Sequence, residues 1–584
     1  MSRVSLKVTG AQGQGVNSVG EICGKGLKRA GYCVFGYREY MSLIKGGHSS
    51  YQLDISNEKI ESTETRADIV MNFDHHGLTE NFYDVKDGGI LLHQTPMWKF
   101  TEDQQKFLKE HAVTVVYLPV EEVLKKLRAG PILGNIFVTA VVWTLFGQGV
   151  ASLKELVREQ FGHKGEEIIR KNFEVIDEAV AYISRQEDVH PLALMKPDSK
   201  WRNHLYLTGS QAMGLGIIHA GCRLYASYPM TPASPLLTYI ADMQNKTGMV
   251  IKQAEDEITA AQIVSGAMLM GTRAATATSG GGFDLMTETL SLNGLLENPF
   301  VVFLFQRPGP ATGLPTWTAQ GDLLLAAGCA HGEFPRLVMA VSGGQDGFDL
   351  MPEAFNYAEE FQTVVIVLSD KQIAEGLSTQ SPYDQKKAEI RRGKLITSPK
   401  ALAKLTAADR YDSKAVDGLS PRWLPGTQAA TFCSQGDEHD AEGRVDESGP
   451  NAAEQMEKRM AKVEALRKAL PEPELYGSQN PEVLVVSWGS NRGPLSDVLK
   501  SDVFNGRKVG YLHYSYLWPL KTEKLMKLAK KAKKTVLVEC NYQGQLGMLI
   551  AQECGFRFDH RILKYDGRPM FFDELFEQLT ALLP

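Results

Sequence analysis

A turn punctuated by two prolines stands near the middle of the chain, directly after a strand-like run at residues 222–227. Pro229 and Pro232 fix the local backbone and remove two amide donors, so the turn should be rigid. Tyr228, Met230 and Thr231 lie within it and carry an aromatic ring, a thioether and a hydroxyl group. We expect this turn to present side chains to a bound molecule.

Three consecutive carboxylates, Glu255, Asp256 and Glu257, precede a run of small apolar residues with helical spacing. That spacing predicts a closely packed, largely buried helix, and an acid in its first turn is unfavourable unless something binds it. The glycine-rich stretch at residues 278–282 leaves room for backbone to approach a ligand. The rigid turn, the acid and the glycine loop together predict a cofactor site.

Two loops near the N-terminus add candidates for binding an anion. The GAQGQG loop at residues 10–15 joins a strand to a helix and is either a phosphate cradle or a tight turn. Its GxxGxG order differs from the GxGxxG order of dinucleotide-binding folds. The next loop contains Lys45, Gly46 and His48, and Arg38 precedes it. The cations and the titratable ring in this stretch suit an anionic ligand, although a solvated loop has a similar composition.

The elements that must position these residues alternate between strands and helices along most of the chain. This pattern predicts an α/β protein with three α/β domains and mostly parallel sheets. We expect a first domain at residues 1–185, a linker at 186–203, a second domain at 204–378, a charged connecting region at 379–475 and a third domain at 476–584. The polar loop at residues 434–443 in the connecting region is suited to reaching a partner chain.

Composition excludes several classes of protein. The 584 residues are too many for one core, and 43% hydrophobic with 23% charged residues is typical of a soluble globular chain. A net charge of −6 argues against nucleic acid as the main partner. We expect neither a signal peptide nor a membrane span. The seven dispersed cysteines form no CxxC pair, which fits a reducing cytoplasm and indicates no metal site or iron–sulfur cluster on this chain.

The order of these motifs resembles the 2-oxoacid:ferredoxin oxidoreductases, specifically their large subunit with a γ-type domain fused ahead of the α-type domain. The resemblance spans nearly the whole chain. It is carried by GAQGQG (10–15), LIKGGHSS (43–50), YPMTPASP (228–235), EDEITAAQIVSGA (255–267), TSGGGFDLM (278–286), GPATGLPT (309–316), QGDL (320–323), HGEFPR (331–336) and GDEHDAEG (436–443).

This resemblance implies thiamine diphosphate as cofactor and residues 204–378 as its pyrimidine-binding domain, with residues 476–584 similar to a transketolase C-terminal domain. Thiamine catalysis needs a carboxyl group hydrogen-bonded to the aminopyrimidine ring, and low dielectric strengthens that bond. Glu257 is our choice for this catalytic and cofactor-binding role. Pro229, Ser279 and Gly280 are expected beside the cofactor, whereas Glu255 and Asp256 are expected to be structural.

The resemblance also implies partners. Thiamine enzymes normally hold Mg²⁺ and diphosphate with a GDG turn, and no GDG occurs in the sequence. We therefore expect a β subunit that carries the Mg²⁺–diphosphate site and a [4Fe-4S] cluster, with ferredoxin as acceptor and a dimer of αβ heterodimers as the assembly. The six lysines between residues 524 and 534 are either a solvated helix face or a docking patch for the acidic electron carrier.

The implied reaction converts a 2-oxoacid and coenzyme A to an acyl-CoA and CO₂ while ferredoxin is reduced, with reversal possible. Thr231, Tyr228 and Met230 are expected at the substrate. Arg307 is the only strong cation in the loop at residues 306–323 and can complete a carboxylate clamp. Trp317 follows GLPT where many relatives carry a basic residue, so the clamp is altered or the pocket is more apolar.

The N-terminal loop implies the choice of substrate. Lys45 and His48 correspond to a loop thought to reach the active site, where they would recognise a distal carboxylate and favour 2-oxoglutarate over pyruvate or a branched-chain 2-oxoacid. Arg38, Lys45 and Gly46 are the candidates for binding coenzyme A. Two readings of other classes stay open: a nicotinamide-dependent dehydrogenase built on GAQGQG, and a scaffold subunit whose partner does the catalysis.

Overall fold

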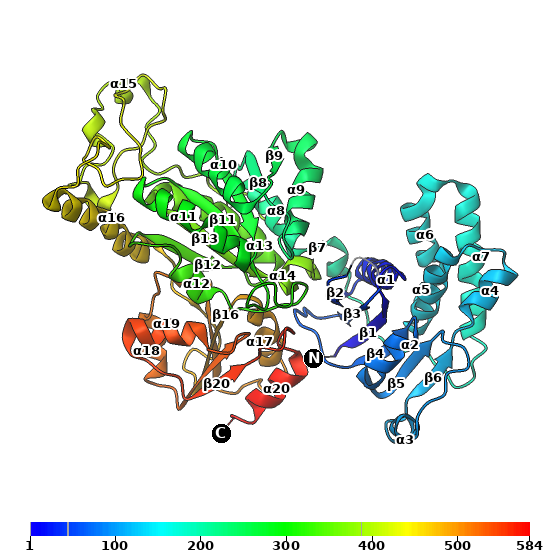
Figure 1. Ribbon diagram of the computed structural model, residues 1–584. Coiled ribbons are helices and arrows are strands. Elements are labelled where there is room, and N and C mark those ends of the chain that lie inside the picture. Colours follow the sequence, from blue (N-terminus) through cyan, green and yellow to red (C-terminus); the bar gives the residue numbers. More distant parts are fainter. Residues whose placement is uncertain (1, 44–45, 387, 584) are drawn as a thin grey trace.

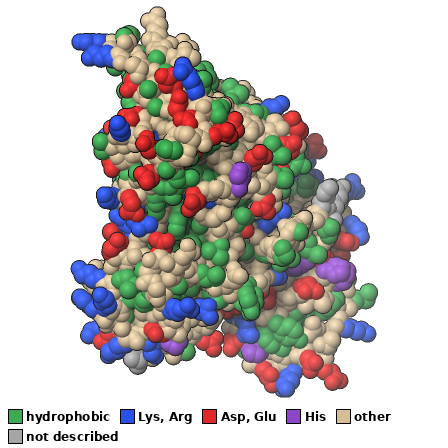
Figure 2. All heavy atoms as spheres, turned by 60° about the vertical axis from the view of Figure 1, so that its left-hand side comes forward, with side chains coloured by type: hydrophobic (Ala, Val, Ile, Leu, Met, Phe, Trp, Pro, Cys, Tyr) green, Lys and Arg blue, Asp and Glu red, His purple; other side chains and the backbone are tan. Residues whose placement is uncertain are grey.

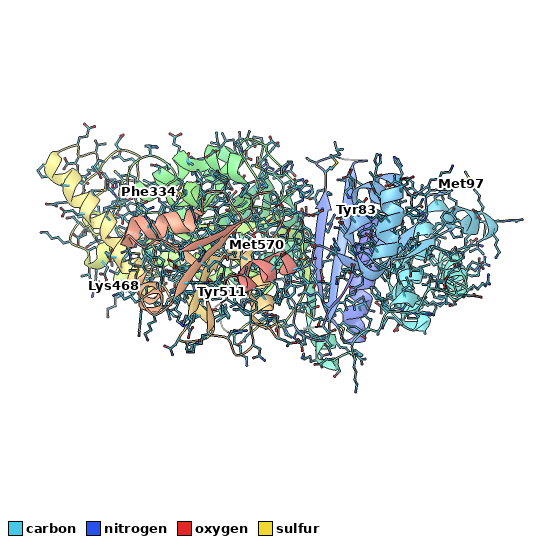
Figure 3. All side chains as sticks on the ribbon, turned by 90° about the horizontal axis from the view of Figure 1, so that it is seen from below. Tyr83, Met97, Phe334, Lys468, Tyr511 and Met570 are labelled. Carbon is cyan, nitrogen blue, oxygen red and sulfur yellow. The ribbon has the colours of Figure 1, made fainter. Side chains whose placement is uncertain are left out.

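Three β-sheets with helices packed on them form the framework of the protein (Figure 1). The computed structural model describes residues 2–43, 46–386 and 388–583. Most strand pairs are parallel, and the predicted α/β class is confirmed. Figure 3 shows the C-terminal segment, in red and orange, beside the blue strands of the first sheet.

The first sheet is mixed, because its β6-β5-β4-β1 half is parallel and the rest is antiparallel. In spatial order its strands are β6 (Thr114–Tyr117), β5 (Val85–His93), β4 (Ala67–Asn72), β1 (Val4–Ala11), β3 (His48–Ser56), β2 (Cys33–Tyr40), β14 (Leu377–Gln380) and β7 (Leu205–Thr208). The helices of this segment are α1 (Val16–Ala30), α2 (His75–Glu80), α3 (Glu102–Glu110), α4 (Val120–Lys126), α5 (Gly134–Leu145), α6 (Val150–Phe161) and α7 (Glu166–Ile183).

The edge of this sheet differs from the expected organisation. The alternating pattern assigned β7 to the second domain, but β7 pairs with β14, and β14 pairs with β2. Both strands have only four residues, so neither has a pattern that shows which sheet it joins. The division of the chain into five segments stays a prediction. The first sheet takes strands from both sides of the linker at residues 186–203, and β14 crosses the boundary at residue 378.

The central sheet has the order β18-β12-β13-β11-β10-β8-β9 and is parallel except for β18. Its strands are β18 (Tyr516–Trp518), β12 (Arg336–Ala340), β13 (Val364–Asp370), β11 (Phe300–Gln306), β10 (Ala274–Thr278), β8 (Leu224–Ser227) and β9 (Val250–Gln253). The helices are α8 (Gly209–His219), α9 (Ser234–Thr247), α10 (Glu257–Leu269), α11 (Gly280–Leu295), α12 (Leu323–Ala327), α13 (Gly344–Phe361) and α14 (Lys371–Glu375).

Strand β11 shows why the strands of this sheet have continuous apolar sequences. Val302 and Leu304 pack with α10 and α11 on one face, while Val301 and Phe303 pack with α8, α9 and α13 on the other. Both faces are covered, so every position of the strand is buried and no polar alternation is possible.

The C-terminal sheet has the order β15-β17-β16-β19-β20 and is parallel except for β15. Its strands are β15 (Glu474–Gly477), β17 (Val509–Tyr514), β16 (Val483–Trp488), β19 (Lys534–Glu539) and β20 (His560–Leu563), and its helices are α17 (Arg492–Leu499), α18 (Glu523–Ala529), α19 (Gln545–Cys554) and α20 (Phe572–Thr580). Strand β18 leaves this segment to pair with β12, so the central and C-terminal segments share a sheet.

The connecting region contains α15 (Pro399–Leu402) and the long α16 (Gly449–Ala469). Its charge is partly buried, because Lys458 and Lys462 of α16 both pair with the buried carboxylate of Glu297. The polar loop at residues 434–443 also packs on its own chain, where His439 is buried with its ring 4.2 Å from that of Tyr411. A contact of this loop with a partner stays a prediction.

The predicted basic helix is α18 with the residues that follow it. Several of its charges are occupied within the chain: the ammonium of Lys533 pairs with Glu482 at 2.7 Å, and Lys524 donates to the carbonyl of Pro473. On the face shown in Figure 2, basic side chains are interspersed with acidic ones. Both readings of this segment stay open.

Candidate active site

Three neighbouring parallel strands end at one edge of the central sheet and carry the predicted site. Strands β8, β10 and β11 lie side by side and run in the same direction. The proline turn follows β8, the glycine loop follows β10, and the loop at residues 306–323 follows β11. Their carboxyl ends form the crevice in which open α/β sheets bind ligands, and the topology brings the three stretches together there.

Glu257 is the first residue of α10 and is only 3% exposed. Its Oε1 atom is buried and accepts no hydrogen bond from any described residue. The neighbouring acids differ. Asp256 caps the helix by accepting a hydrogen bond from the backbone amide of Thr259 at 2.7 Å, and Glu255 is exposed. One of the three carboxylates is therefore buried with an unused acceptor, which is costly unless a ligand supplies the donor.

The glycine loop fits closely around this carboxylate. A Cβ atom on Gly282 would lie 2.4 Å from Oε1 of Glu257 and 2.1 Å from Oγ1 of Thr278. Ser279 is fully buried, and its hydroxyl also has no partner among the described residues. Glycine at position 282 thus allows the N-terminus of α11 to approach Glu257, and two unpartnered polar atoms lie in this part of the crevice.

The turn and the long loop are joined by Arg307. Its Nη1 atom donates a hydrogen bond of 2.6 Å to the backbone carbonyl of Thr231. The hydroxyl of Thr278, at the end of β10, donates to the sulfur of Met230 in the turn at 3.7 Å. Tyr228 is 39% exposed at the end of β8. The structure therefore brings Thr231 and Arg307 together, with Tyr228 at the open side of the turn.

Asp322 also lies beside the glycine loop, which was not expected from the sequence. Its carboxylate oxygens lie 3.2 and 3.4 Å from the position of a Cβ on Gly280, and Oδ2 is buried without a partner among the described residues. Burial, and then the charge of Asp284, raise the pKa of Asp322 to about 6, while Arg307 opposes that rise. The QGDL motif contained it, but nothing in the motif indicated that this acid turns back towards the glycine loop.

Trp317 is half-buried in the same loop, with the guanidinium of Arg568 lying 3.8 Å from the centre of its ring. Arg568 comes from the C-terminal segment, and its Nε atom lies 3.8 Å from Oε1 of Glu39 in the first segment. Arg568 therefore contacts both the loop that carries Trp317 and Glu39 of the first segment.

The N-terminal glycine loop forms a separate cavity of 420 Å³. Gly13, Gly15 and Arg38 are among the residues that line it, so one predicted anion-binding residue faces the loop. Gly46 lies nearby in sequence, and the carbonyl of Gly47 accepts a hydrogen bond from the amide of Gln12 at 3.1 Å. Lys45 lies outside the described residues.

His48 starts β3 opposite Ala11, and burial lowers the pKa of its ring. Both ring nitrogens of His48 are buried without a hydrogen-bond partner among the described residues, so His48 contacts neither Thr231 nor Arg307 through a hydrogen bond there. The two groups of predicted substrate residues thus belong to different elements, and the proposed action of His48 on the substrate stays untested.

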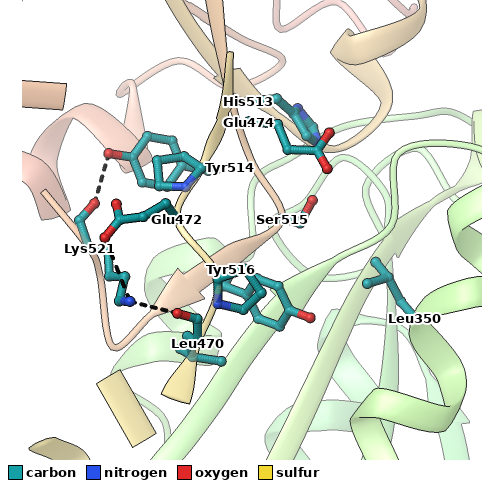
Figure 4. A pocket seen from close by; sticks show the side chains of 11 residues that line it. Leu350, Leu470, Glu472, Glu474, His513, Tyr514, Ser515, Tyr516 and Lys521 are labelled. Carbon is teal, nitrogen blue, oxygen red and sulfur yellow. Dashed lines mark hydrogen bonds and ion pairs between the residues drawn. The ribbon is translucent and has the colours of Figure 1, made fainter. Parts of the chain in front are cut away.

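A further hollow of 160 Å³ lies between α13 and the C-terminal strands (Figure 4). Lys521 is one of the residues that line it and donates to the carbonyl of Leu470 at 2.6 Å. His513 lies at one side, with Nδ1 2.6 Å from the hydroxyl of Tyr511, and burial holds its pKa well below the ordinary value. None of the carboxyl-end loops of β8, β10 and β11 lines this hollow.

Two family models match the chain at the segments that carry these features. Residues 5–182 match "Pyruvate ferredoxin/flavodoxin oxidoreductase", and residues 215–463 match "Pyruvate flavodoxin/ferredoxin oxidoreductase, thiamine diP-bdg". The 2-oxoacid:ferredoxin oxidoreductase subunit alpha of a Sulfolobus species is 34% identical, over 100% of this chain and 97% of its own length. The chain belongs to the 2-oxoacid:ferredoxin oxidoreductases.

Other members of this oxidoreductase family show the same relationship. The 2-oxoglutarate synthase subunit KorA of Methanothermobacter marburgensis is 31% identical over 58% of this chain and 88% of its own length. The 2-oxoglutarate:ferredoxin oxidoreductase from Magnetococcus marinus, solved with 2-oxoglutarate, coenzyme A and succinyl-CoA bound, is 28% identical with a TM-score of 0.92. The match covers 100% of this chain and 99% of the Magnetococcus marinus chain.

The recognition made from the motifs is therefore confirmed, and the chain is the α subunit of a multi-subunit, thiamine-dependent 2-oxoacid:ferredoxin oxidoreductase. Unpartnered Glu257 Oε1 and Ser279 Oγ fit a polar cofactor in the crevice. Within the described ranges, no group of three or more histidine, cysteine, aspartate or glutamate side chains is arranged to hold a metal ion. No helix in the same ranges is long and apolar enough to cross a membrane.

Proposed function

We propose that the substrate is 2-oxoglutarate and that Glu257 is the carboxyl group that binds the aminopyrimidine of thiamine diphosphate. The observation that carries the second part is the buried Oε1 of Glu257, which has no donor among the described residues and faces Gly282. The names of two relatives, and the ligands of the Magnetococcus marinus structure, support the first part. Pyruvate and branched-chain 2-oxoacids remain the alternative substrates.

The balanced reaction takes one 2-oxoglutarate, one coenzyme A and two oxidised ferredoxins to succinyl-CoA, CO₂, two reduced ferredoxins and one proton. Thiamine diphosphate, when bound, supplies the electron sink that allows the carbon–carbon bond next to the 2-oxo group to break. Glu257 would hold the pyrimidine in a dry site, where the low dielectric strengthens the hydrogen bond. Pro229, Ser279 and Gly280 would line the cofactor.

The substrate end of the site follows from the Arg307–Thr231 contact. The hydrogen bond to the Thr231 carbonyl fixes one edge of the guanidinium, so its remaining donors are available to the carboxylate of a 2-oxoacid. Thr231, Met230 and Tyr228 would complete that end. Arg38, with Lys45 and Gly46, would bind the phosphates of coenzyme A at the N-terminal glycine loop, whose cavity Arg38 lines.

The other half of the site is proposed to come from a β subunit, because the sequence has no GDG turn for Mg²⁺ and diphosphate. That subunit would also carry a [4Fe-4S] cluster that passes electrons to ferredoxin. The assembly would be a cytoplasmic dimer of αβ heterodimers.

The test is a comparison of two glutamate variants in the complex with its partner. Glu257→Gln should lower thiamine-dependent viologen reduction about 10²- to 10⁴-fold and release thiamine diphosphate on gel filtration. Glu255→Gln is the matched control, because that carboxylate is exposed two residues away. Full activity of Glu257→Gln would refute the role of Glu257, and the scaffold reading survives only in that case. A higher kcat/KM for pyruvate than for 2-oxoglutarate would refute the substrate assignment.

A further inference from the structure

Arg568 presents a cation that the site described above does not use. Its guanidinium stacks on Trp317, its Nη1 atom donates to the carbonyl of Asp566 at 3.0 Å, and its Nε atom lies 3.8 Å from Glu39. The side chain is still 38% exposed. No hydrogen bond from Nη2 to any residue in the described part of the chain is present. Stacking leaves the in-plane N–H groups free to bind an anion.

The backbone at Gly567, next to Arg568, packs against the loop that carries Arg307. The carbonyl of Gly567 accepts a hydrogen bond of 3.0 Å from the amide of Thr318. A Cβ atom on Gly567 would lie 3.2 Å from Cβ of Trp317 and 3.6 Å from Cγ of Pro308, which directly follows Arg307. Arg568 therefore belongs to the surface of the 306–323 loop, although it comes from another segment.

The loop folds so that these contacts are close to one another. The amide of Leu314 donates to the carbonyl of Pro308 at 3.0 Å, and the amide of Trp317 donates to the carbonyl of Leu314 at 3.2 Å. Two successive turns thus bring Trp317 back towards the beginning of the loop. Arg307 and Arg568 are two cations supported by one compact loop.

We propose that Arg568 binds the distal carboxylate of a dicarboxylic 2-oxoacid, with Trp317 as the platform that orients the guanidinium. This inference rests on the proposed function, in which Arg307 binds the carboxylate next to the oxo group. A planar guanidinium fork matches a carboxylate better than an ammonium does. The cavity lined by Arg38 offers coenzyme A a separate anion site, so the substrate is the better match for Arg568.

Glu39 has a defined place in this arrangement. It accepts a hydrogen bond from the hydroxyl of Tyr37 at 2.9 Å, which fixes its carboxylate beside the guanidinium. Its separation of 3.8 Å from Nε of Arg568 is longer than a direct charge-assisted hydrogen bond. Glu39 therefore partly neutralises the guanidinium when no substrate is bound, and leaves its free edge available to the substrate.

The experiment compares two substrates in the purified complex with its partner: 2-oxoglutarate, and 2-oxobutyrate, which lacks the distal carboxylate. Arg568→Gln should lower kcat/KM for 2-oxoglutarate about 10- to 100-fold and change that for 2-oxobutyrate by less than about threefold. The KM for coenzyme A should stay unchanged. Arg568→Lys should retain part of the preference, because it keeps the charge without the planar fork.

Arg507→Gln is the matched control, since Arg507 is an exposed arginine of the same segment, and it should alter neither substrate. An equal loss for both substrates in Arg568→Gln, with a lowered melting temperature, would make Arg568 structural and overturn the inference. A rise confined to the KM for coenzyme A, or an unchanged preference, would overturn it as well. If the unmodified complex did not turn over 2-oxoglutarate, the proposed function itself would fail.

Discussion

Replacing Glu297 with glutamine should destabilise the protein strongly, because it leaves two buried ammonium groups without their carboxylate. Lys458 and Lys462 of α16 each pair with one oxygen of Glu297, and all three side chains are at most 1% exposed. Arg410 adds hydrogen bonds to the Glu297 carbonyl and to the Gln362 side chain, both at 3.1 Å. This cluster attaches the connecting region to the central sheet.

The magnitude follows from the burial of the charges. Burial opposes ionisation of Glu297, but the two lysines and Arg410 hold its pKa far below the ordinary range. Burial likewise lowers the pKa of Lys462 to about 7, although Glu297 opposes that change. Removing one member of a buried ion pair typically costs about 3–5 kcal/mol, because an uncompensated charge remains. We expect Glu297→Gln to lower the free energy of unfolding by about that amount at about pH 6, where both lysines are protonated.

The sign of the pH dependence identifies the cause. The pKa of each lysine is lower in the folded than in the unfolded state, so protonation favours unfolding. Loss of Glu297 lowers the folded-state pKa values further. At acidic pH the variant therefore loses more folding stability than the unmodified protein. This difference for each lysine disappears as the pH rises above that lysine's folded-state pKa in the unmodified protein, which is about 7 for Lys462. The deficit should therefore be larger at about pH 6 than at about pH 9.

The assay is denaturant unfolding at the two pH values, with hydrogen exchange along α16 to locate the loosened segment. Glu121→Gln is the control, because its pair with Lys125 spans 3.7 Å between side chains that are 87% and 80% exposed. That variant should unfold at the midpoint of the unmodified protein. A deficit for Glu297→Gln below about 1 kcal/mol, or one equal at both pH values, would refute the reasoning.

Two further predictions concern the crevice. Gly282→Ala should displace Glu257 and abolish most activity of the complex. Gly281→Ala is the control and should keep that activity, because its Cβ would meet nothing within 4 Å. Equal viologen reduction by both variants would contradict the close fit. Because the pKa of Asp322 is raised to about 6 from 3.8, the protein should lose stability as pH rises between those values, and Asp322→Asn should remove that loss. Melting temperatures that fall equally in both proteins across that pH range would exclude Asp322 as the cause.

Much of the central segment could be predicted from local pattern alone. Continuous apolar runs such as residues 300–305 predict strands buried on both faces, and the structure has β11 there. Small residues after Glu257 predict a packed helix, and α10 begins at that residue. These predictions succeed because hydrophobic period and helix-terminus chemistry operate over a few neighbouring residues. The motif order also identified the family, which the 34% identity to the Sulfolobus α subunit confirms.

The connecting region shows where composition misleads. It was predicted only as a charged connecting region, yet Lys458 and Lys462 are buried, because Glu297 from a distant loop compensates their charge. The charge of a residue does not show whether an oppositely charged side chain, far away in sequence, will pair with it in the folded protein. Similarly, β7 and β14 are too short to indicate that they extend the first sheet.

The sequence by itself determined the family, the α/β class and the residue types of the crevice: a buried acid, a glycine loop, a proline turn and one loop arginine. Only the tertiary structure placed Asp322 beside Gly280, and Arg568 of the C-terminal segment over Trp317. Neighbouring residues reveal their conformation through local sterics and burial. Contacts between segments depend on strand order and on how loops return across a sheet edge, and no local pattern encodes them.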